Sequence, residues 1–253
     1  MAQPTYSADA IVLKKTKLGE ADLILTMIAR DGSQLRAVAK GARKPGGAFA
    51  GKLEVCNRVH LLCSQGRSLD IVKEARLDAA RPALAADAER AACAACAAEL
   101  AERLTQPELE HPRMFDLLDA SFAALAEARG ATMLYLCAAT LLKLFAFAGI
   151  MPQLDRCAIC DGPAPATAGR VAFSIADGGA VCAACAAAAE AYPVDADVLA
   201  LAASLLMATF DSIAATPADE AFAQRVLAFC DDWSRFHVGA KLRSLDFLLS
   251  LTA

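Results

Sequence analysis

The sequence predicts an α+β protein of several parts: an N-terminal five-stranded barrel of the OB type, then an all-α domain with an inserted four-cysteine zinc module. Three observations predict this class. Short strand-like runs separated by turns fill most of residues 8–76, helical patterns dominate from residue 81, and two Cys-x-x-Cys pairs interrupt the helical part. We therefore expect the OB-fold at 1–78, the helical domain at 79–253 and the zinc module at 155–187.

The five expected strands mix apolar and polar residues over short runs, as half-buried strands do. Asp31-Gly32 between the second and third runs is a hairpin signal. Gln65-Gly66-Arg67 separates the last two, and a glycine-rich loop follows the third. Five short strands joined by turns are typical of a small closed barrel. We expect the strands at 8–16, 21–30, 33–39, 55–62 and 68–76.

Helical patterns then continue to the C-terminus, at 82–104, 112–128, 131–150, 195–210, 217–236 and 240–249. Asp195 is a plausible N-cap for the fourth. The third is nearly all apolar and long enough to span a bilayer. However, Lys143 lies inside it and a hydrophilic module follows, so we expect a buried helix with Lys143 at its edge and no membrane contact.

The cysteines indicate a reducing compartment. The first ten residues lack the basic and then apolar pattern of a signal peptide, and six of the ten cysteines fall in Cys-x-x-Cys pairs, so we expect a cytoplasmic protein. Cys93-x-x-Cys96 lies in an alanine-rich helical run with no second pair to complete a site. We expect it, and the remaining cysteines, to be small core residues. These are Cys56, Cys63, Cys93, Cys96, Cys137 and Cys230.

The net charge of −4 conceals an asymmetry between the two parts. Residues 1–76 hold thirteen Lys or Arg and seven Asp or Glu, a charge of +6. The remaining twelve basic and twenty-two acidic residues give −10. A basic module joined to an acidic one suggests that the first faces a polyanion.

The metal motif is Cys157-x-x-Cys160 and, after twenty-one residues, Cys182-x-x-Cys185. Two such knuckles supply four thiolates, the number that a tetrahedral structural Zn²⁺ needs. Between them lie several Gly and Pro residues and one strand-like run, Arg170–Ile175. So little apolar material favours a fold that a metal stabilises. The alternatives are four cysteines that bind no metal, or a redox pair.

Basic residues cluster around the loop after the third strand. Lys40, Arg43 and Lys44 lie in it, Lys52 follows, and Lys14, Lys15 and Lys17 end the first strand. Such a cluster at the loops of a barrel fits a phosphate backbone. The alternative is a solvated loop. Only two rings, Tyr6 and Phe49, lie in this part, so binding should depend mainly on charge; Phe49 could stack on a base or anchor its loop.

Motifs of catalysis are missing. The sequence has no phosphate-binding GxxxxGK[ST] loop, no GxGxxG turn after a strand and no HExxH. Its three histidines lie near no candidate nucleophile in a recognisable arrangement. Four thiolates close a zinc coordination sphere, whereas catalytic zinc keeps an open position. We therefore expect no enzymatic activity.

Three segments together resemble one family: ADAIVLKKTKLGEADLILTMIARDGSQLRAVAKGARKPGGAFAGKLE, the paired Cys-x-x-Cys motifs, and HVGAKLRSLDFLL near the end. They are similar to RecO, the bacterial recombination mediators, over essentially the whole chain. The resemblance implies an OB-fold, an all-helical C-terminal domain and, in many members, a four-cysteine zinc module.

The resemblance also carries roles to particular residues. Lys40-Gly41-Ala42-Arg43-Lys44 matches the family's AKGARK loop and would be part of a DNA surface. The four paired cysteines match the zinc ligands, and Gly239, Lys241, Leu242, Ser244, Leu245 and Phe247 match a C-terminal segment that should be structural. Gly46 and Gly47 stand where the family often has further basic residues, which thins the positive patch.

The hypothesis is therefore a non-enzymatic repair mediator. The resemblance implies that it binds single- and double-stranded DNA, anneals complementary strands and, with RecR, helps to load RecA onto DNA covered by the single-stranded-DNA-binding protein. It would act in the cytoplasm, at the nucleoid during repair. One alternative is a zinc-stapled protein-interaction adaptor with no direct DNA role. Another is a metal-dependent hydrolase, which would need one of the four cysteines to be a non-ligand.

Overall fold

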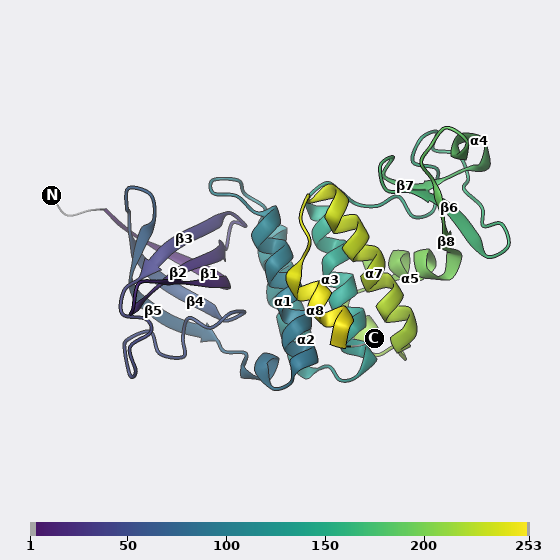
Figure 1. Cartoon of the computed structure of the whole chain (residues 1–253). Coiled ribbons are helices and arrows are strands. Elements are labelled where there is room, and N and C mark those ends of the chain that lie inside the picture. The colour runs from purple at the N-terminus through teal and green to yellow at the C-terminus, as the bar shows by residue number, and fades with distance from the viewer. Residues whose placement is uncertain (1–3, 252–253) are drawn as a thin grey trace. The chain divides into compact units, whose positions relative to one another are not determined.

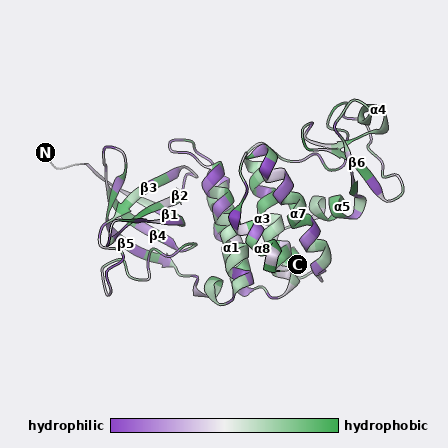
Figure 2. Ribbon diagram, in the orientation of Figure 1, coloured by the Kyte–Doolittle hydropathy of each residue, from purple (hydrophilic) through white to green (hydrophobic). Residues whose placement is uncertain are grey.

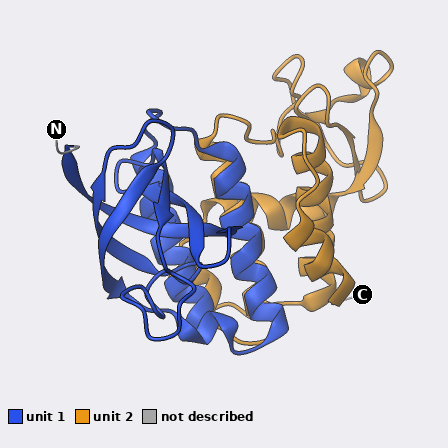
Figure 3. Cartoon of the chain, turned by 60° about the vertical axis from the view of Figure 1, so that its left-hand side comes forward, with its two compact units in different colours: residues 1–126 blue, residues 127–253 orange. Residues whose placement is uncertain are grey.

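The computed structural model describes residues 4–251 and divides the chain into two compact units, 1–126 and 127–253. Figure 1 names the helices and strands, and Figure 3 colours the two units separately. The first unit contains the strand-rich part and two helices, and the second contains the remaining helices and the cysteine-bearing module. The predicted domain boundary at 78/79 coincides with the change from strands to helices. That the two predicted domains are separate folding units stays a prediction.

Five strands form a closed barrel, as the sequence predicts. They are β1 (Thr5–Leu18), β2 (Asp22–Ala29), β3 (Gln34–Ala39), β4 (Arg58–Ser64) and β5 (Asp70–Ala79), in the order β1-β2-β3-β5-β4. All pairs are antiparallel except β3 with β5. The bands of hydrophobic and hydrophilic colour along these strands in Figure 2 reflect the alternation of inner and outer side chains. The fourth strand begins at Arg58 rather than at 55, because the chain turns through Cys56 at φ 70°.

The barrel interior is filled by side chains from all five strands and from the long loop 40–57. Leu25, Met27, Val59 and Leu61 are fully buried there. Phe49 joins this core at 8% exposure. Of the two roles that the sequence left open, Phe49 therefore anchors its loop.

Two helices cover part of the barrel's outer surface: α1 (Ala88–Leu104) and α2 (Pro112–Glu127). Ile11 and Ile28 belong to strands but not to the inner core, yet both are fully buried. The Gln34 amide donates to the carbonyls of Glu102 and Thr105 at 2.9 and 3.1 Å. Gly32 comes so close to the backbone of His111 that a Cβ would lie 2.0 Å from its carbonyl oxygen. Residue 32 therefore has to be glycine for the two backbone segments to approach so closely.

The expected helix 82–104 forms in two parts. A short 3₁₀ helix (Pro82–Ala85) comes first, and α1 begins only after Asp87, whose carboxylate accepts a hydrogen bond from the Arg90 backbone N–H at 2.8 Å. This N-cap restarts the chain as an α-helix.

Several basic residues of the barrel hold these helices in place. Arg30 pairs with Asp116 at 2.9 Å, and Arg58 pairs with Asp119 at 2.6 Å. Arg81 contacts the same Asp119, and its guanidinium is largely buried. Part of the positive charge of residues 1–76 is therefore neutralised inside the first unit.

The second unit is built around α3 (Ala131–Phe147), most of which is fully buried. The helices packed in the same unit are α5 (Ala196–Met207), α6 (Phe210–Ala214), α7 (Glu220–His237) and α8 (Arg243–Leu251). Within residues 4–251, no helix is long and apolar enough to cross a membrane. The Lys143 ammonium donates to the carbonyl of Leu206, and burial lowers its pKa. The helix expected at 195–210 ends earlier, because α5 stops at Met207 and a separate helix, α6, begins at Phe210.

The cysteine-bearing module contains more sheet than the sequence predicts. Beside β6 (Arg170–Ser174) lie β7 (Gly179–Val181) and β8 (Tyr192–Asp195), in the order β7-β6-β8, with a short helix α4 (Ala183–Ala186) between them. The sheet thus continues past residue 187. Asp195 occupies the N-cap position of α5, but its side chain makes no capping hydrogen bond. It pairs instead with Arg170 at 3.3 Å and with Arg225.

Candidate metal centre and nucleic-acid interface

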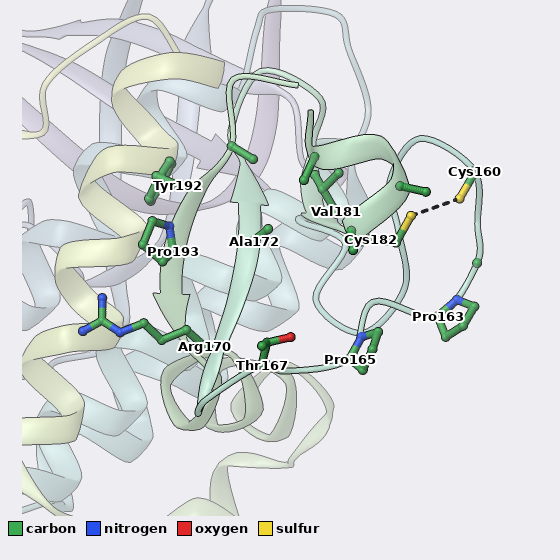
Figure 4. A pocket seen from close by; sticks show the side chains of 15 residues that line it. Cys160, Pro163, Pro165, Thr167, Arg170, Ala172, Val181, Cys182, Tyr192 and Pro193 are labelled. Atoms are coloured by element: carbon green, nitrogen blue, oxygen red, sulfur yellow. Dashed lines mark hydrogen bonds between the residues drawn. The ribbon is translucent and has the colours of Figure 1, made fainter. Parts of the chain in front are cut away.

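The two Cys-x-x-Cys pairs meet at one point. The sulfur atoms of Cys157, Cys160, Cys182 and Cys185 all lie within 4.8 Å of one another. The Sγ atoms of Cys160 and Cys182 are 3.8 Å apart, and a dashed line joins them in Figure 4. A tetrahedron of Zn–S bonds of about 2.3 Å places its sulfurs about 3.8 Å apart. The sulfurs are thus too far apart for a disulfide and at the spacing of a four-thiolate metal site.

Backbone hydrogen bonds build the first knuckle. Cys157 N–H donates to the carbonyl of Gly162 at 2.8 Å, and Asp161 N–H donates back to the carbonyl of Cys157 at 2.9 Å. Asp161 has φ 57°, so the turn passes through the left-handed region. The Arg156 side chain pairs with the Asp161 carboxylate at 2.8 Å, which closes the outside of the knuckle.

The second knuckle begins a helix. The N–H groups of Cys185 and Ala186 donate to the carbonyl of Cys182 at 3.1 and 2.9 Å, so Cys182 and Cys185 lie one turn apart at the start of α4. Close packing joins the knuckles to the sheet: Ala158 N–H donates to Ala180 at 2.8 Å. A Cβ on Gly179 would lie 2.3 Å from the carbonyl oxygen of Gln153, so only glycine fits there.

The protonation of the thiols fits a cation at this point. Backbone hydrogen bonds from Cys182 and Cys160 lower the pKa of Cys157 to about 6. The neighbouring thiols Cys182 and Cys160 raise the pKa of Cys185 to about 12. Four sulfurs in this space cannot all ionise without a positive charge between them, and a divalent metal supplies that charge. The four cysteines can therefore hold one metal ion as a closed set of ligands.

An aromatic cluster fastens the cysteine-bearing module to the helices of its unit. Phe173 of β6 is fully buried and packs edge-on against Phe229 and Trp233 of α7, with ring centroids 5.3 and 6.1 Å apart. The Trp233 indole N–H donates to the carbonyl of Ile150 at 2.9 Å. His237 stacks on Trp233, and its Nε2 lies 3.0 Å from the carbonyl of Ile175. The metal site and α7 are thus parts of one packed structure.

A hollow of about 700 Å³ opens on the other face of this sheet (Figure 4). Ala172, Val181 and Pro193 are cross-strand neighbours and contribute to its lining. Cys160 and Cys182 border it as well. The sulfurs of Cys160 and Cys182 are therefore reachable from solvent, whereas Phe173, the neighbour of Ala172 on β6, is fully buried.

Most of the predicted DNA-binding residues come together at one end of the barrel. Strand pairing sets Leu18 beside Asp22 and Leu23 beside Ala39, so β1 ends, β2 begins and β3 ends at the same edge. We call this edge, with the start of the loop 40–57, the cationic end. It carries Lys17, Lys40, Arg43 and Lys44. Lys15 lies three residues before β1 ends, and Lys52 lies further along the loop, where its carbonyl accepts a hydrogen bond from the Asn57 amide.

Hydrogen bonds hold the basic loop in one position. Asp22 accepts a hydrogen bond from the Gly41 N–H at 2.7 Å, and Gly41 has φ 69°. Arg43 donates from its backbone to Ala21 at 2.9 Å and from its guanidinium to Gly19 and Glu20 at 3.3 and 2.9 Å. The Arg43 side chain is thus engaged in fixing the loop, and its partners are neutral carbonyls rather than carboxylates.

The predicted basic residues differ in their surroundings. Lys14 pairs with Glu102 of α1 at 2.9 Å and lies on the side that the helix covers. Lys15 pairs with Glu54. Within the described chain, Lys17, Lys40, Lys44 and Lys52 form no ion pair. Two residues that matter for these sites were not predicted from the sequence: Asp22, which holds the basic loop, and Phe173, which anchors the cysteine-bearing module. The sequence showed only an acidic residue at the start of a strand and an aromatic residue in an alternating run.

The comparisons with known proteins agree along the whole chain. The family description "Recombination protein O N terminal" matches residues 1–80, and "Recombination protein O C terminal" matches residues 85–246. A DNA repair protein RecO of Bifidobacterium adolescentis is 32% identical over 247 residues, which cover 97% of this chain and 99% of that protein. A DNA repair protein RecO of Pelotomaculum thermopropionicum is 34% identical over 244 residues, covering 96% and 93%.

Proposed function

Because the chain belongs to the RecO family of DNA repair proteins, we propose that it binds single- and double-stranded DNA at its cationic end and anneals complementary strands. With RecR it would help to load RecA onto DNA covered by the single-stranded-DNA-binding protein. It would do so in the cytoplasm, at the nucleoid, and without catalysing a reaction. The four cysteines would hold a structural Zn²⁺.

One observation carries the DNA proposal: strand pairing and the Asp22–Gly41 bond gather Lys17, Lys40 and Lys44 at one edge, and no carboxylate of residues 4–251 forms an ion pair with them. Phosphate contacts with Lys and Arg release condensed counterions, which drives binding. Annealing follows from the same contacts. Two complementary strands repel each other through their phosphates, and a cationic surface that neutralises both leaves the base edges free to pair.

The test is annealing of two complementary labelled oligonucleotides at several salt concentrations. Wild type is compared with Lys40→Gln/Lys44→Gln, which removes two charges and leaves the Arg43 bonds in place. A matched control, Arg113→Gln/Arg129→Gln, removes two exposed charges elsewhere that form no ion pair within residues 4–251. We expect the first variant to anneal more slowly and to lose about 1.4 from the slope of log affinity for single strands against log salt, at about 0.7 per phosphate contact.

The outcomes separate the function from the site. If wild type neither binds nor anneals, the DNA proposal is wrong, and the adaptor alternative takes its place. If wild type anneals and both variants match it, the function stands and the site lies elsewhere on the protein.

A further inference from the structure

The outer face of the barrel carries a row of aliphatic side chains beside the cationic end. The register sets Ile24 of β2 opposite Val38 of β3, and Val38 opposite Ile71 of β5. We call these three residues the aliphatic row. Their neighbours Leu25, Ala37 and Val72 belong to the inner core. Because successive side chains of a strand point to opposite faces, the aliphatic row points outward.

This row lies beyond the part of the face that α1 covers. Thr26 and Ile28, further along β2, are 5% and 0% exposed, and Gln34 opposite Ile28 is bonded to the end of α1. Ile24, Val38 and Ile71, in contrast, are only partly buried. Adjacent strands are about 4.8 Å apart, so the row forms an apolar strip about 10 Å long.

Cations lie on both sides of the strip. Arg36 is opposite Thr26 on one side. On the other, Lys40 directly follows the end of β3, and Lys73 lies two residues after Ile71 on β5. Among residues 4–251, Arg36, Lys40 and Lys73 have no carboxylate partner within ion-pair distance, and both Arg36 and Lys73 are exposed. The nearby acids are Asp22, which is bonded to Gly41, Asp70, which is bonded to Tyr6 and Gly66, and the exposed Glu74.

We propose that the aliphatic row is a base-docking strip for single-stranded nucleic acid, with Arg36 and Lys73 as further phosphate contacts. The inference rests on the proposed DNA binding and extends it to a preference for single strands. An apolar strip flanked by cations matches a strand whose bases are unpaired, since the bases cover the strip while the phosphates meet the charges. In a duplex the base faces are stacked inside, so only the cations are used.

The experiment compares single-strand and duplex affinity for full-length wild type and the variant Ile24→Thr/Val38→Thr/Ile71→Thr. Threonine is β-branched like isoleucine and valine and leaves the net charge unchanged, but it removes part of the apolar surface that a base would contact. We expect single-strand affinity to fall on the order of tenfold with an unchanged salt slope, and duplex affinity to stay within about twofold. Leu77→Thr, an exposed leucine elsewhere on β5, serves as the matched control and should change neither.

Two further variants sharpen the test. Arg36→Gln/Lys73→Gln should weaken both single-strand and duplex binding and reduce the single-strand salt slope by about 1.4. Val38→Tyr adds a ring to the strip and should tighten single-strand binding about fivefold. Unfolding midpoints equal to that of wild type would show that the variants fold.

The strip is excluded if the threonine variant binds single strands as wild type does, or loses single-strand and duplex affinity equally. The proposed DNA binding survives either result. Failure of wild type to bind any DNA would overturn both.

Discussion

The barrel and the cysteine-bearing module both contain irregular loops, but different interactions hold these loops in place. In the barrel, loop 40–57 inserts Phe49 and Leu53 into a core shared by five strands. In the module, two of the three strands have only three and four residues, and the loops between them converge on four sulfurs. The barrel is held by buried side chains, and the module by one aromatic anchor and, as we propose, by a metal bound to the four cysteines.

The contrast shows what each loop presents to solvent. Apolar anchors inside the barrel leave the outer atoms of its loop available, so basic side chains can stay unpaired at the cationic end. In the knuckles, by contrast, the four cysteine sulfurs are turned toward one point and face one another. The barrel therefore suits a binding surface, and the module suits a brace for α7.

Removal of the metal should have the largest effect and should separate the two regions. We expect full-length Cys160→Ser, or chelation of wild type, to lose bound zinc and to destabilise the second unit by several kcal/mol, because metal binding contributes directly to folding of such modules. Trp233 is the only tryptophan and packs against Phe173, so its fluorescence reports this change. Barrel-dependent annealing should persist. Loss of annealing together with zinc would contradict the division of roles.

Phe173→Ala tests the aromatic anchor without touching a ligand. The ring is fully buried between Phe229 and Trp233, so its removal should cost about 3–5 kcal/mol of unfolding free energy. Zinc content should stay at one ion per chain, measured by a metal-sensitive dye after denaturation. If zinc is lost as well, the cluster depends on the anchor, and the two supports are not separate.

Tyr6→Phe probes the barrel in the same way, with a smaller effect. The Tyr6 hydroxyl donates to the Asp70 carboxylate, so the variant should lose about 1–2 kcal/mol. Burial and this bond raise the pKa of Tyr6 above its usual value. A raised pKa means that stability is present below about pH 10 and falls as the pH rises further. Wild type should therefore lose stability above pH 10 more steeply than Tyr6→Phe in urea titrations.

Asp22 gives the smallest but most discriminating change. Asp22→Ala removes a negative charge from the cationic end, which by charge alone should tighten DNA binding. It also frees the Gly41 N–H and releases the loop, so we expect single-strand binding about fivefold weaker. Asp22→Asn keeps an acceptor without the charge and should bind at least as well as wild type. Tighter binding by both variants would show that loop position is unimportant.

Local patterns in the sequence were sufficient for much of this structure. Alternating residues and turn signals predicted all five barrel strands, and the Cys-x-x-Cys spacing predicted the cluster of four sulfurs. Phe49 could not be assigned, because its burial depends on where its loop folds back. β8 was missed because Tyr192-Pro193-Val194 is too short to show alternation, and only pairing with β6 makes it a strand.

Contacts between residues distant in sequence also determine which charged side chains form ion pairs. The +6 charge of residues 1–76 was visible, but nothing local showed that Arg30 and Arg58 would pair with Asp116 and Asp119. Lys14 likewise meets Glu102, eighty-eight positions away. The expected capping by Asp195 failed for the same reason, because two arginines distant in sequence take up its carboxylate.

These internal pairs bear on how the N-terminal part should be handled as a reagent. A fragment that ends at residue 78 would lack Glu102, Asp116 and Asp119. Their basic partners Lys14, Arg30 and Arg58 would then be unpaired. The apolar surface around Ile11 and Ile28 would also be exposed to solvent. Such a truncation should adhere to any polyanion more strongly than the intact chain and should tend to aggregate. DNA affinities measured on this fragment would overestimate that of the barrel in the intact chain. A fragment that keeps the native ion pairs should run at least to residue 126.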